Sequence, residues 1–185
     1  MSAGCKIMDQ YGMHFCTFTI VQWADIFTRQ VYRDIVADSL NHCIAEKGLQ
    51  VHAYVFMSNH IHCVLSAAHG NLSGIIRDMK SYTAKLIYVQ LREVTESRRD
   101  WLDLVCRYAA GGHSRNKDFQ VWEHDNHPEE IFSRKFLIQK TNYIHNNPVK
   151  AGLVREPEHW LYSSAADYAA GKQVGLVNVS LLDFR

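Results

Sequence analysis

Two histidines separated by one residue, His60 and His62, are the side chains whose type and spacing point most directly to chemistry. They lie in an apolar, β-branched segment from His60 to Ser66, which we expect to be a strand. Because side chains alternate along a strand, the two imidazoles share one face while Ile61 points to the other. Two neighbouring imidazoles can chelate one divalent ion. The alternative is a pair of half-exposed polar residues on the solvent side of a sheet.

A second group of reactive side chains lies on a predicted helix that begins near Ser133 and ends near Asn147, where Pro148 follows. Lys140, Tyr143 and Asn147 are spaced so that they line one side of this helix. An Asn carbonyl oxygen is a hard donor that suits Mg²⁺ or Mn²⁺. A phenol beside such a cation can act as a nucleophile toward phosphorus. The same spacing also fits an ordinary amphipathic helix in which Lys140 forms a surface salt bridge.

The hydrophobic pattern predicts the elements that must position these groups. Strands are expected at His14 to Val21, Val51 to Met57, His60 to Ser66 and Phe119 to Glu123. Helices are expected at Arg29 to Lys47, from Asn71 or Ser73 onward, at about Ser97 to Ala110, and after Ser133, with a polar loop over Gly112 to Asp118. This order predicts an α+β fold of the ferredoxin-like, split βαβ kind, in which helices pack on one face of an antiparallel sheet.

The composition is that of an ordinary globular protein. The 185 residues are 47% hydrophobic and carry a net charge of +1, which argues neither for nor against nucleic acid as a partner. No repeat or linker divides the chain, so we expect a single domain over residues 1–185, with residues from about 155 to 185 packed on its body. The absence of a long apolar run predicts no membrane partner. Five cysteines without a C-x-x-C pair predict reduced thiols and a cytoplasmic location.

Four segments of the chain resemble a known family. YVFMSNHIHCVL (residues 54–65) and NYIHNNPVKAGLV (residues 142–154) are similar to segments of the single-tyrosine HUH transposases, above all the REP-associated tyrosine transposases and their IS200-like relatives. FQVWEHDNHP (residues 119–128) and PEHWLYSSAADY (residues 157–168) resemble the same family. The segments occur in the family's order, so the resemblance covers about residues 15–168.

The resemblance implies a DNA transposase that cleaves and rejoins single-stranded DNA through a 5′-phosphotyrosine intermediate. Tyr143 would be the nucleophile, and His60, His62 and Asn147 would bind Mg²⁺ or Mn²⁺. The substrate would be single-stranded DNA next to a hairpin, and the family includes both monomers and homodimers. One alternative is a domesticated protein that binds DNA hairpins without strand transfer. Another is a hydrolase that uses water on a two-histidine metal site.

Several further residues are candidates for contact with DNA. Basic side chains on the predicted second long helix can follow a phosphate backbone, namely Arg77, Lys80 and Lys85. The alternative for these residues is a solvated helix face. Lys140 can hold the phosphate that is cleaved. Trp122 can stack on a base or fill the core, and the core is favoured because aromatic residues in strands usually pack.

Overall fold

The computed structural model describes residues 6–93, 95–112 and 118–184. The strands are β1 (His14–Thr19), β2 (Leu49–Phe56), β3 (His60–Ala67) and β4 (Glu129–Glu130). The α-helices are α1 (Gln30–Lys47), α2 (Leu72–Leu91), α3 (Arg99–Gly111), α4 (Arg134–Lys150) and α5 (Ala165–Ala170). Short 3-10 turns lie at Val21–Trp23, Ile26–Thr28 and Pro157–His159.

The strands form one sheet in the order β2-β3-β1-β4. Both β1 and β2 pair antiparallel with β3, so β1 and β2 run in the same direction with β3 between them. This is the split βαβ arrangement, with α1 as the crossover. The α+β class and the antiparallel sheet expected from the sequence are therefore confirmed.

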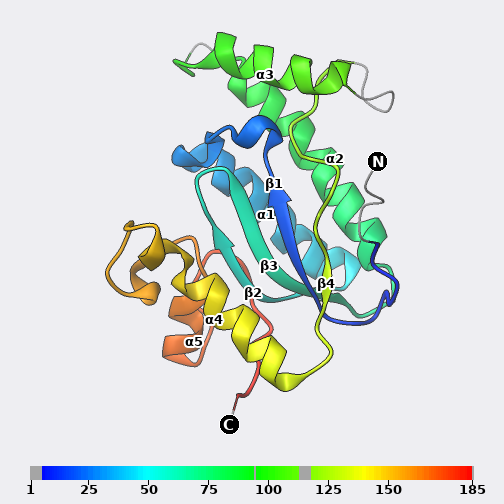
Figure 1. The fold of residues 1–185 in the computed structure, drawn as a ribbon, viewed down its shortest axis with the longest axis vertical. Coiled ribbons are helices and arrows are strands. Elements are labelled where there is room, and N and C mark those ends of the chain that lie inside the picture. Colours follow the sequence, from blue (N-terminus) through cyan, green and yellow to red (C-terminus); the bar gives the residue numbers. More distant parts are fainter. Residues whose placement is uncertain (1–5, 94, 113–117, 185) are drawn as a thin grey trace.

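Helices cover both faces of this sheet. The larger core lies between the sheet and α1 and α2, and it contains Phe18, Tyr54 and Ile61. A smaller cluster on the opposite face is formed by Phe15, Ala53, Val55, Met57, Val64 and Ile144, the last of which belongs to α4. In Figure 1, α4 crosses in front of the strands while α1 lies behind them. The sequence analysis expected helices on one face only. In the structure α4 packs on the other face, where Ile144 gives this helix an apolar contact.

The segment from Phe119 to Glu123 is not the fourth strand, in contrast to the sequence-based expectation. It follows the edge of β1 and the turn after it through separate hydrogen bonds, in which Val21 N donates to Val121 O (2.9 Å) and Glu123 N donates to Thr19 O (2.8 Å). The segment stays at this edge as far as Asn126, whose carbonyl accepts from Thr17 N (2.8 Å), and His127 then adopts a left-handed backbone with φ 42°. A continuous ladder resumes only at β4, which pairs with His14 and Phe15.

The sequence predicted that Pro148 would end α4. Instead, Pro148 lies within the last turn of this helix. A proline in this position removes only the N–H that would bond to the Ile144 carbonyl, and the turn is completed by other bonds. Ala151 N donates to Asn147 O (3.0 Å), and Leu153 N donates to Pro148 O (2.9 Å). The helical backbone therefore continues through Asn147, which keeps its side chain on the same stripe as Tyr143.

The C-terminal segment borders the outer edge of β2. Phe56 N donates to Tyr162 O (2.8 Å), Ser164 N donates to Tyr54 O (3.0 Å), and Ser180 N donates to Val51 O (2.8 Å). These bonds occupy backbone groups that an edge strand would otherwise expose. The division of residues 1–185 into a single domain stays a prediction.

Two smaller expectations concern the thiols and the membrane. Cys16, Cys43, Cys63 and Cys106 are buried free thiols. Within the described residues, no helix combines the length and the apolar character that crossing a bilayer requires. The polar loop expected over Gly112 to Asp118 lies for the most part outside the described residues.

Candidate active site

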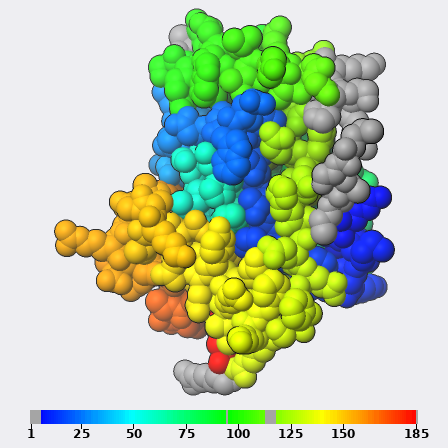
Figure 2. Space-filling model, in the orientation of Figure 1, coloured from blue at the N-terminus to red at the C-terminus, as the bar shows by residue number. Residues whose placement is uncertain are grey.

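His60 and His62 lie side by side on the face of β3 that is turned away from α1 and α2. Their ring centroids are 4.6 Å apart. Between them, Ile61 points into the larger core and is fully buried. The alternation expected from the H-x-H spacing is present. It places both imidazoles on the face of the sheet opposite the larger core, near the beginning of β3. In Figure 2 this part of the sheet reaches the surface between the blue segment that follows β1 and the yellow helix α4.

Hydrogen bonds fix the orientation of both imidazole rings. His60 Nδ1 lies 2.7 Å from Asn59 Oδ1, which can only accept, so Nδ1 carries the proton. His62 Nδ1 lies 2.9 Å from Thr17 Oγ1, whose hydroxyl can accept in the same way. This pattern leaves the Nε2 lone pair of each ring for another partner. Metal-binding histidines characteristically have such a second partner on the nitrogen that does not bind the metal.

Both histidines are held in the neutral state. Burial lowers the pKa of His60 below its ordinary value. Burial also lowers the pKa of His62, to about 3, with smaller contributions from His60 and from the positive charge of Lys140. A neutral imidazole is the form that binds a metal ion, because protonation removes the lone pair. The pair therefore has, at neutral pH, the protonation state that metal binding would require.

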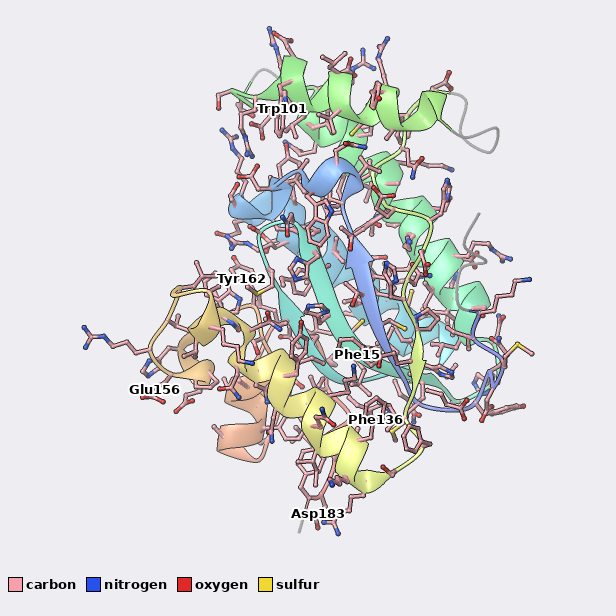
Figure 3. All side chains as sticks on the ribbon, viewed as in Figure 1. Phe15, Trp101, Phe136, Glu156, Tyr162 and Asp183 are labelled. Atoms are coloured by element: carbon pink, nitrogen blue, oxygen red, sulfur yellow. The ribbon has the colours of Figure 1, made fainter. Side chains whose placement is uncertain are left out.

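Tyr143 approaches the histidines from α4. Its hydroxyl oxygen lies 3.5 Å from His62 Nε2, and the two ring centroids are 5.2 Å apart. Phe15 of β1 stacks on His62 at 5.4 Å and meets the edge of the Tyr143 ring at 5.9 Å. Figure 3 shows Phe15 on the sheet next to α4. Tyr143 is 40% exposed, so the residue is partly open to solvent.

The position of Tyr143 depends on how α4 is anchored. Ser133 caps the helix by accepting a hydrogen bond from Phe136 N (3.2 Å). Ile144, directly after Tyr143, is fully buried against the sheet. His145 Nε2 bonds to Ser164 Oγ at 2.8 Å, which ties the helix to the C-terminal segment. Burial lowers the pKa of His145 to about 4, so this histidine is a neutral anchor.

Lys140 and Asn147 flank Tyr143 on the same helix. Lys140 Nζ forms an ion pair with Glu129 Oε1 (2.5 Å) and lies 4.2 Å from the centre of the Phe15 ring. Asn147 Nδ2 donates to Tyr143 O at 3.1 Å. This bond uses the amide nitrogen, while the carbonyl oxygen is the atom that a hard cation would bind.

The two histidines supply nitrogen donors. They fit a hard divalent cation only if at least one oxygen ligand joins them. In residues 6–93, 95–112 and 118–184, no group of three or more His, Cys, Asp or Glu side chains could hold a metal ion. Within these residues, a third ligand for such a cation would have to be a donor of another type. Asn147 lies one helical turn from Tyr143, and a phosphate oxygen of a substrate is a second source of oxygen.

The basic residues expected to contact DNA gather at a different place. Arg77, Lys80 and Lys85 of α2 line a groove of about 830 Å³ whose other wall is residues 119–124, 126 and 128. Since α2 covers the face of the sheet opposite α4, this groove does not join the His62 and Tyr143 site. Lys80 Nζ donates to Glu123 O at 2.6 Å, and burial lowers the pKa of Lys80 to about 8. Arg77 forms an ion pair with Asp78.

Trp122 fills the core and does not offer its ring to a base. Its side chain is 4% exposed, and its Nε1 donates to Thr83 Oγ1 at 3.0 Å. The ring packs near Phe18 and Phe27. The interpretation that the sequence favoured for this residue is correct, and a stacking role would require the core to open.

Sequence reasoning did not identify the residues that orient the imidazoles. Asn59 directly precedes His60, and this adjacency was an available signal for a partner of its ring. Thr17 lies on the predicted first strand, but its pairing with His62 depends on strand register. The role of Phe15 as a spacer between the sheet and Tyr143 depends on the packing of α4, for which the sequence carried no signal.

The chain thus combines a ferredoxin-like antiparallel sheet with a histidine pair on one face and a tyrosine-bearing helix beside that pair. A family model described as "Transposase IS200 like" matches residues 9–121, and the chain belongs to this family. The matched region contains both histidines and ends before Tyr143. Membership implies a DNA-cleaving, metal-dependent enzyme.

One solved structure extends the similarity of fold beyond that region. The structure of a REP-associated tyrosine transposase bound to a REP hairpin is 18% identical, with a TM-score of 0.64, over 97% of this chain and 96% of that chain. A putative transposase from Deinococcus radiodurans R1 is 14% identical, with a TM-score of 0.43, over 79% of this chain and 97% of that one. No curated protein sequence matches this chain.

Proposed function

We propose that this protein cleaves and rejoins single-stranded DNA in DNA transposition, with Tyr143 as the nucleophile. The observation that carries this proposal is the 3.5 Å separation between the Tyr143 hydroxyl and His62 Nε2. It puts a reactive oxygen beside a pair of neutral imidazoles, in a chain of the IS200-like transposase family. A cation at the imidazoles and a phosphate between cation and phenol would then occupy one small space.

The covalent step exchanges one phosphate ester for another. Tyr143 Oη attacks the phosphorus, and the bond from phosphorus to the 3′ oxygen breaks. The tyrosine is left joined to the 5′ phosphate, and the departing 3′ oxygen takes a proton to become a free hydroxyl. Rejoining is the reverse reaction, in which a 3′ hydroxyl attacks the phosphotyrosine and releases Tyr143.

His60, His62 and Asn147 would hold Mg²⁺ or Mn²⁺. Such a cation polarises the phosphate and stabilises the negative charge that builds up on its oxygens. When His62 Nε2 is a ligand, its lone pair cannot also accept the phenol proton. That proton therefore leaves to solvent, which reaches the partly exposed Tyr143 side chain. The positive charge of Lys140, close enough to act on His62, would also offset the charge of the phosphate.

The substrate we propose is single-stranded DNA next to a hairpin. Support comes from the structural neighbour, which is bound to a REP hairpin. Arg77, Lys80 and Lys85 line the groove along α2. The exposed Arg77 and Lys85 offer their charges to phosphates of the hairpin stem, whereas Lys80 Nζ is already bonded to Glu123 O. Monomer and homodimer both remain compatible with this proposal.

The test is formation of a covalent adduct. An end-labelled single strand that carries a hairpin from the DNA flanking the coding region is incubated with the protein and Mg²⁺ or Mn²⁺. A labelled protein band on a denaturing gel is expected, and Tyr143→Phe should abolish it. Tyr108→Phe is the matched control, because Tyr108 is an exposed tyrosine on α3.

The other outcomes separate the alternatives. An adduct that persists in Tyr143→Phe would show that another residue is the nucleophile. Strand cleavage without an adduct, equal in the wild type and in Tyr143→Phe, would indicate a hydrolase that uses water. Tight binding of the hairpin with no cleavage in either metal would indicate a hairpin-binding protein without strand transfer.

A further inference from the structure

The turn that follows β1 exposes a large aromatic side chain beside His60. Trp23 is 64% exposed, although an indole of this size is normally buried. Its ring centroid lies 6.0 Å from that of His60, with the rings inclined at 70°. An edge contact of this kind covers only part of the indole. Most of the ring is therefore free to meet another flat group next to the histidine pair.

The backbone of this turn is strained. Gln22 and Trp23 have φ values of 53° and 56°, so two consecutive residues other than glycine adopt the left-handed region. Side chains with a Cβ are disfavoured there, and such conformations persist only where the surroundings hold them. A relaxed turn would carry the indole elsewhere, so the strain fixes where the Trp23 ring is presented.

Several hydrogen bonds hold the strained turn. Trp23 N donates to Ile20 O at 3.0 Å, and Gln22 N donates to Glu123 Oε1 at 3.4 Å. Asn59 Nδ2 donates to Trp23 O at 3.2 Å. The Oδ1 atom of the same Asn59 side chain accepts from His60 Nδ1 at 2.7 Å. A single amide therefore sets the positions of both the tryptophan turn and the His60 ring.

We propose that the Trp23 indole is a stacking platform for one unpaired base of single-stranded DNA, next to the phosphate that Tyr143 attacks. This inference rests on the proposed function, since it takes the histidine pair as the place where that phosphate binds. The base of a nucleotide is only a few bonds from its phosphate, so a phosphate at His60 brings a base close to Trp23. An unpaired base offers both of its faces for stacking, whereas a paired base within a duplex does not.

The experiment measures binding without cleavage, in the Tyr143→Phe background and with Mg²⁺ present. The two probes are a fluorescein-labelled oligo(dT) and a strand of the same length in which every nucleotide is abasic. Trp23→Ala should weaken binding of oligo(dT) by roughly 5- to 150-fold, the range that corresponds to the loss of one stacked base. Binding of the abasic strand should not change, because that strand has no base to stack.

Two variants serve as controls. Trp23→Phe keeps an aromatic ring at the same place and should retain most of the affinity for oligo(dT). Trp101→Ala removes another exposed tryptophan, on α3, and should have no effect. The melting temperature and the affinity for Mn²⁺ of Trp23→Ala should equal those of its parent, since the indole does not bind the cation.

Three results would overturn the proposal that Trp23 stacks on a base. The first is an unchanged affinity of Trp23→Ala for oligo(dT). The second is an equal loss of affinity for both probes, which would mean that the residue supports the backbone site and not a base. The third is a loss of Mn²⁺ affinity that accounts for the whole effect. Failure of the proposed function looks different, because it is a lack of the Tyr143 adduct while the dependence on Trp23 and on bases remains.

Discussion

The Tyr143 hydroxyl lies 3.5 Å from His62 Nε2, although 81 positions separate the two residues in the chain. The contact joins the open face of β3 to a helix that follows the last strand. Phe15 of β1 fills the space beside both rings. The geometry of the site therefore depends on the docking of α4 onto the sheet, and that docking depends on few apolar residues.

Ile144→Ala should impair the site by loosening α4. Ile144 is fully buried in the small cluster between α4 and the sheet, and its loss leaves a cavity. We expect a destabilisation of about 2–5 kcal/mol, measured by chemical denaturation. Because Ile144 adjoins Tyr143, formation of the covalent adduct should fall even where the variant is fully folded.

The matched control for this variant is Leu161→Ala, which removes a largely exposed leucine from the C-terminal segment. It should change stability by less than about 0.5 kcal/mol. If Ile144→Ala formed the adduct as fast as the wild type at a temperature where both are folded, the packing of α4 would not control the position of Tyr143.

Thr17→Val should weaken metal binding without a large effect on the fold. The substitution keeps the shape of the side chain but removes the hydroxyl that lies 2.9 Å from His62 Nδ1. Loss of such a partner of a metal-binding histidine typically costs about 10- to 100-fold in affinity. Titration with Mn²⁺ followed by calorimetry measures the change. Thr19→Val, the same substitution opposite His60, is the control and should have a smaller effect.

The histidine pair shows how much of the candidate site could be predicted from the sequence. Alternation along a strand put His60 and His62 on one face and Ile61 on the other, and the structure has this arrangement. The rule needs only local geometry, so one segment was sufficient. The spacing of Tyr143 and Asn147 on α4 is of the same kind.

The sequence-based predictions that were wrong concern features that depend on the whole fold. Nothing in α4 itself says on which face of the sheet it packs, because both faces offer apolar residues. The segment from Phe119 to Glu123 has the composition of a strand, yet its ladder with β1 is interrupted and resumes at Glu129. The expected stop at Pro148 failed because one missing hydrogen bond near the end of a helix is tolerated. The strained turn at Trp23 leaves no periodic signal at all.

Lys85→Gln should reduce the salt dependence of hairpin binding. Lys85 is an exposed residue on the wall of the α2 groove, where we propose that phosphates of the hairpin stem lie. Removal of one phosphate contact lowers the slope of log affinity against log salt by about 1. Anisotropy titrations over a range of NaCl concentrations give the slope. Lys172→Gln, at an exposed position after α5, should leave it unchanged, and an equal change in both variants would argue against the groove.

The buried histidines should make the fold sensitive to acid, and His145 allows a direct test. Burial lowers its pKa from 6.5 to about 4 in the folded protein. The unfolded chain therefore binds more protons between these values, and stability is lost as the pH falls from about 6.5 toward 4. The contribution of His145 to this loss reaches about 3 kcal/mol at the lower end. Denaturation at a series of pH values should show a shallower decline for His145→Gln than for the wild type.

Ser164→Ala tests whether burial or hydrogen bonding is the cause of the lowered pKa of His145. It removes the hydroxyl 2.8 Å from His145 Nε2 but keeps the imidazole in its buried place. The variant should be less stable than the wild type at pH 7 while keeping the steep decline toward acid, because burial, and not this bond, lowers the pKa of His145. A decline in His145→Gln as steep as in the wild type would mean that other groups, among them the buried His52 and His62, account for the whole acid sensitivity.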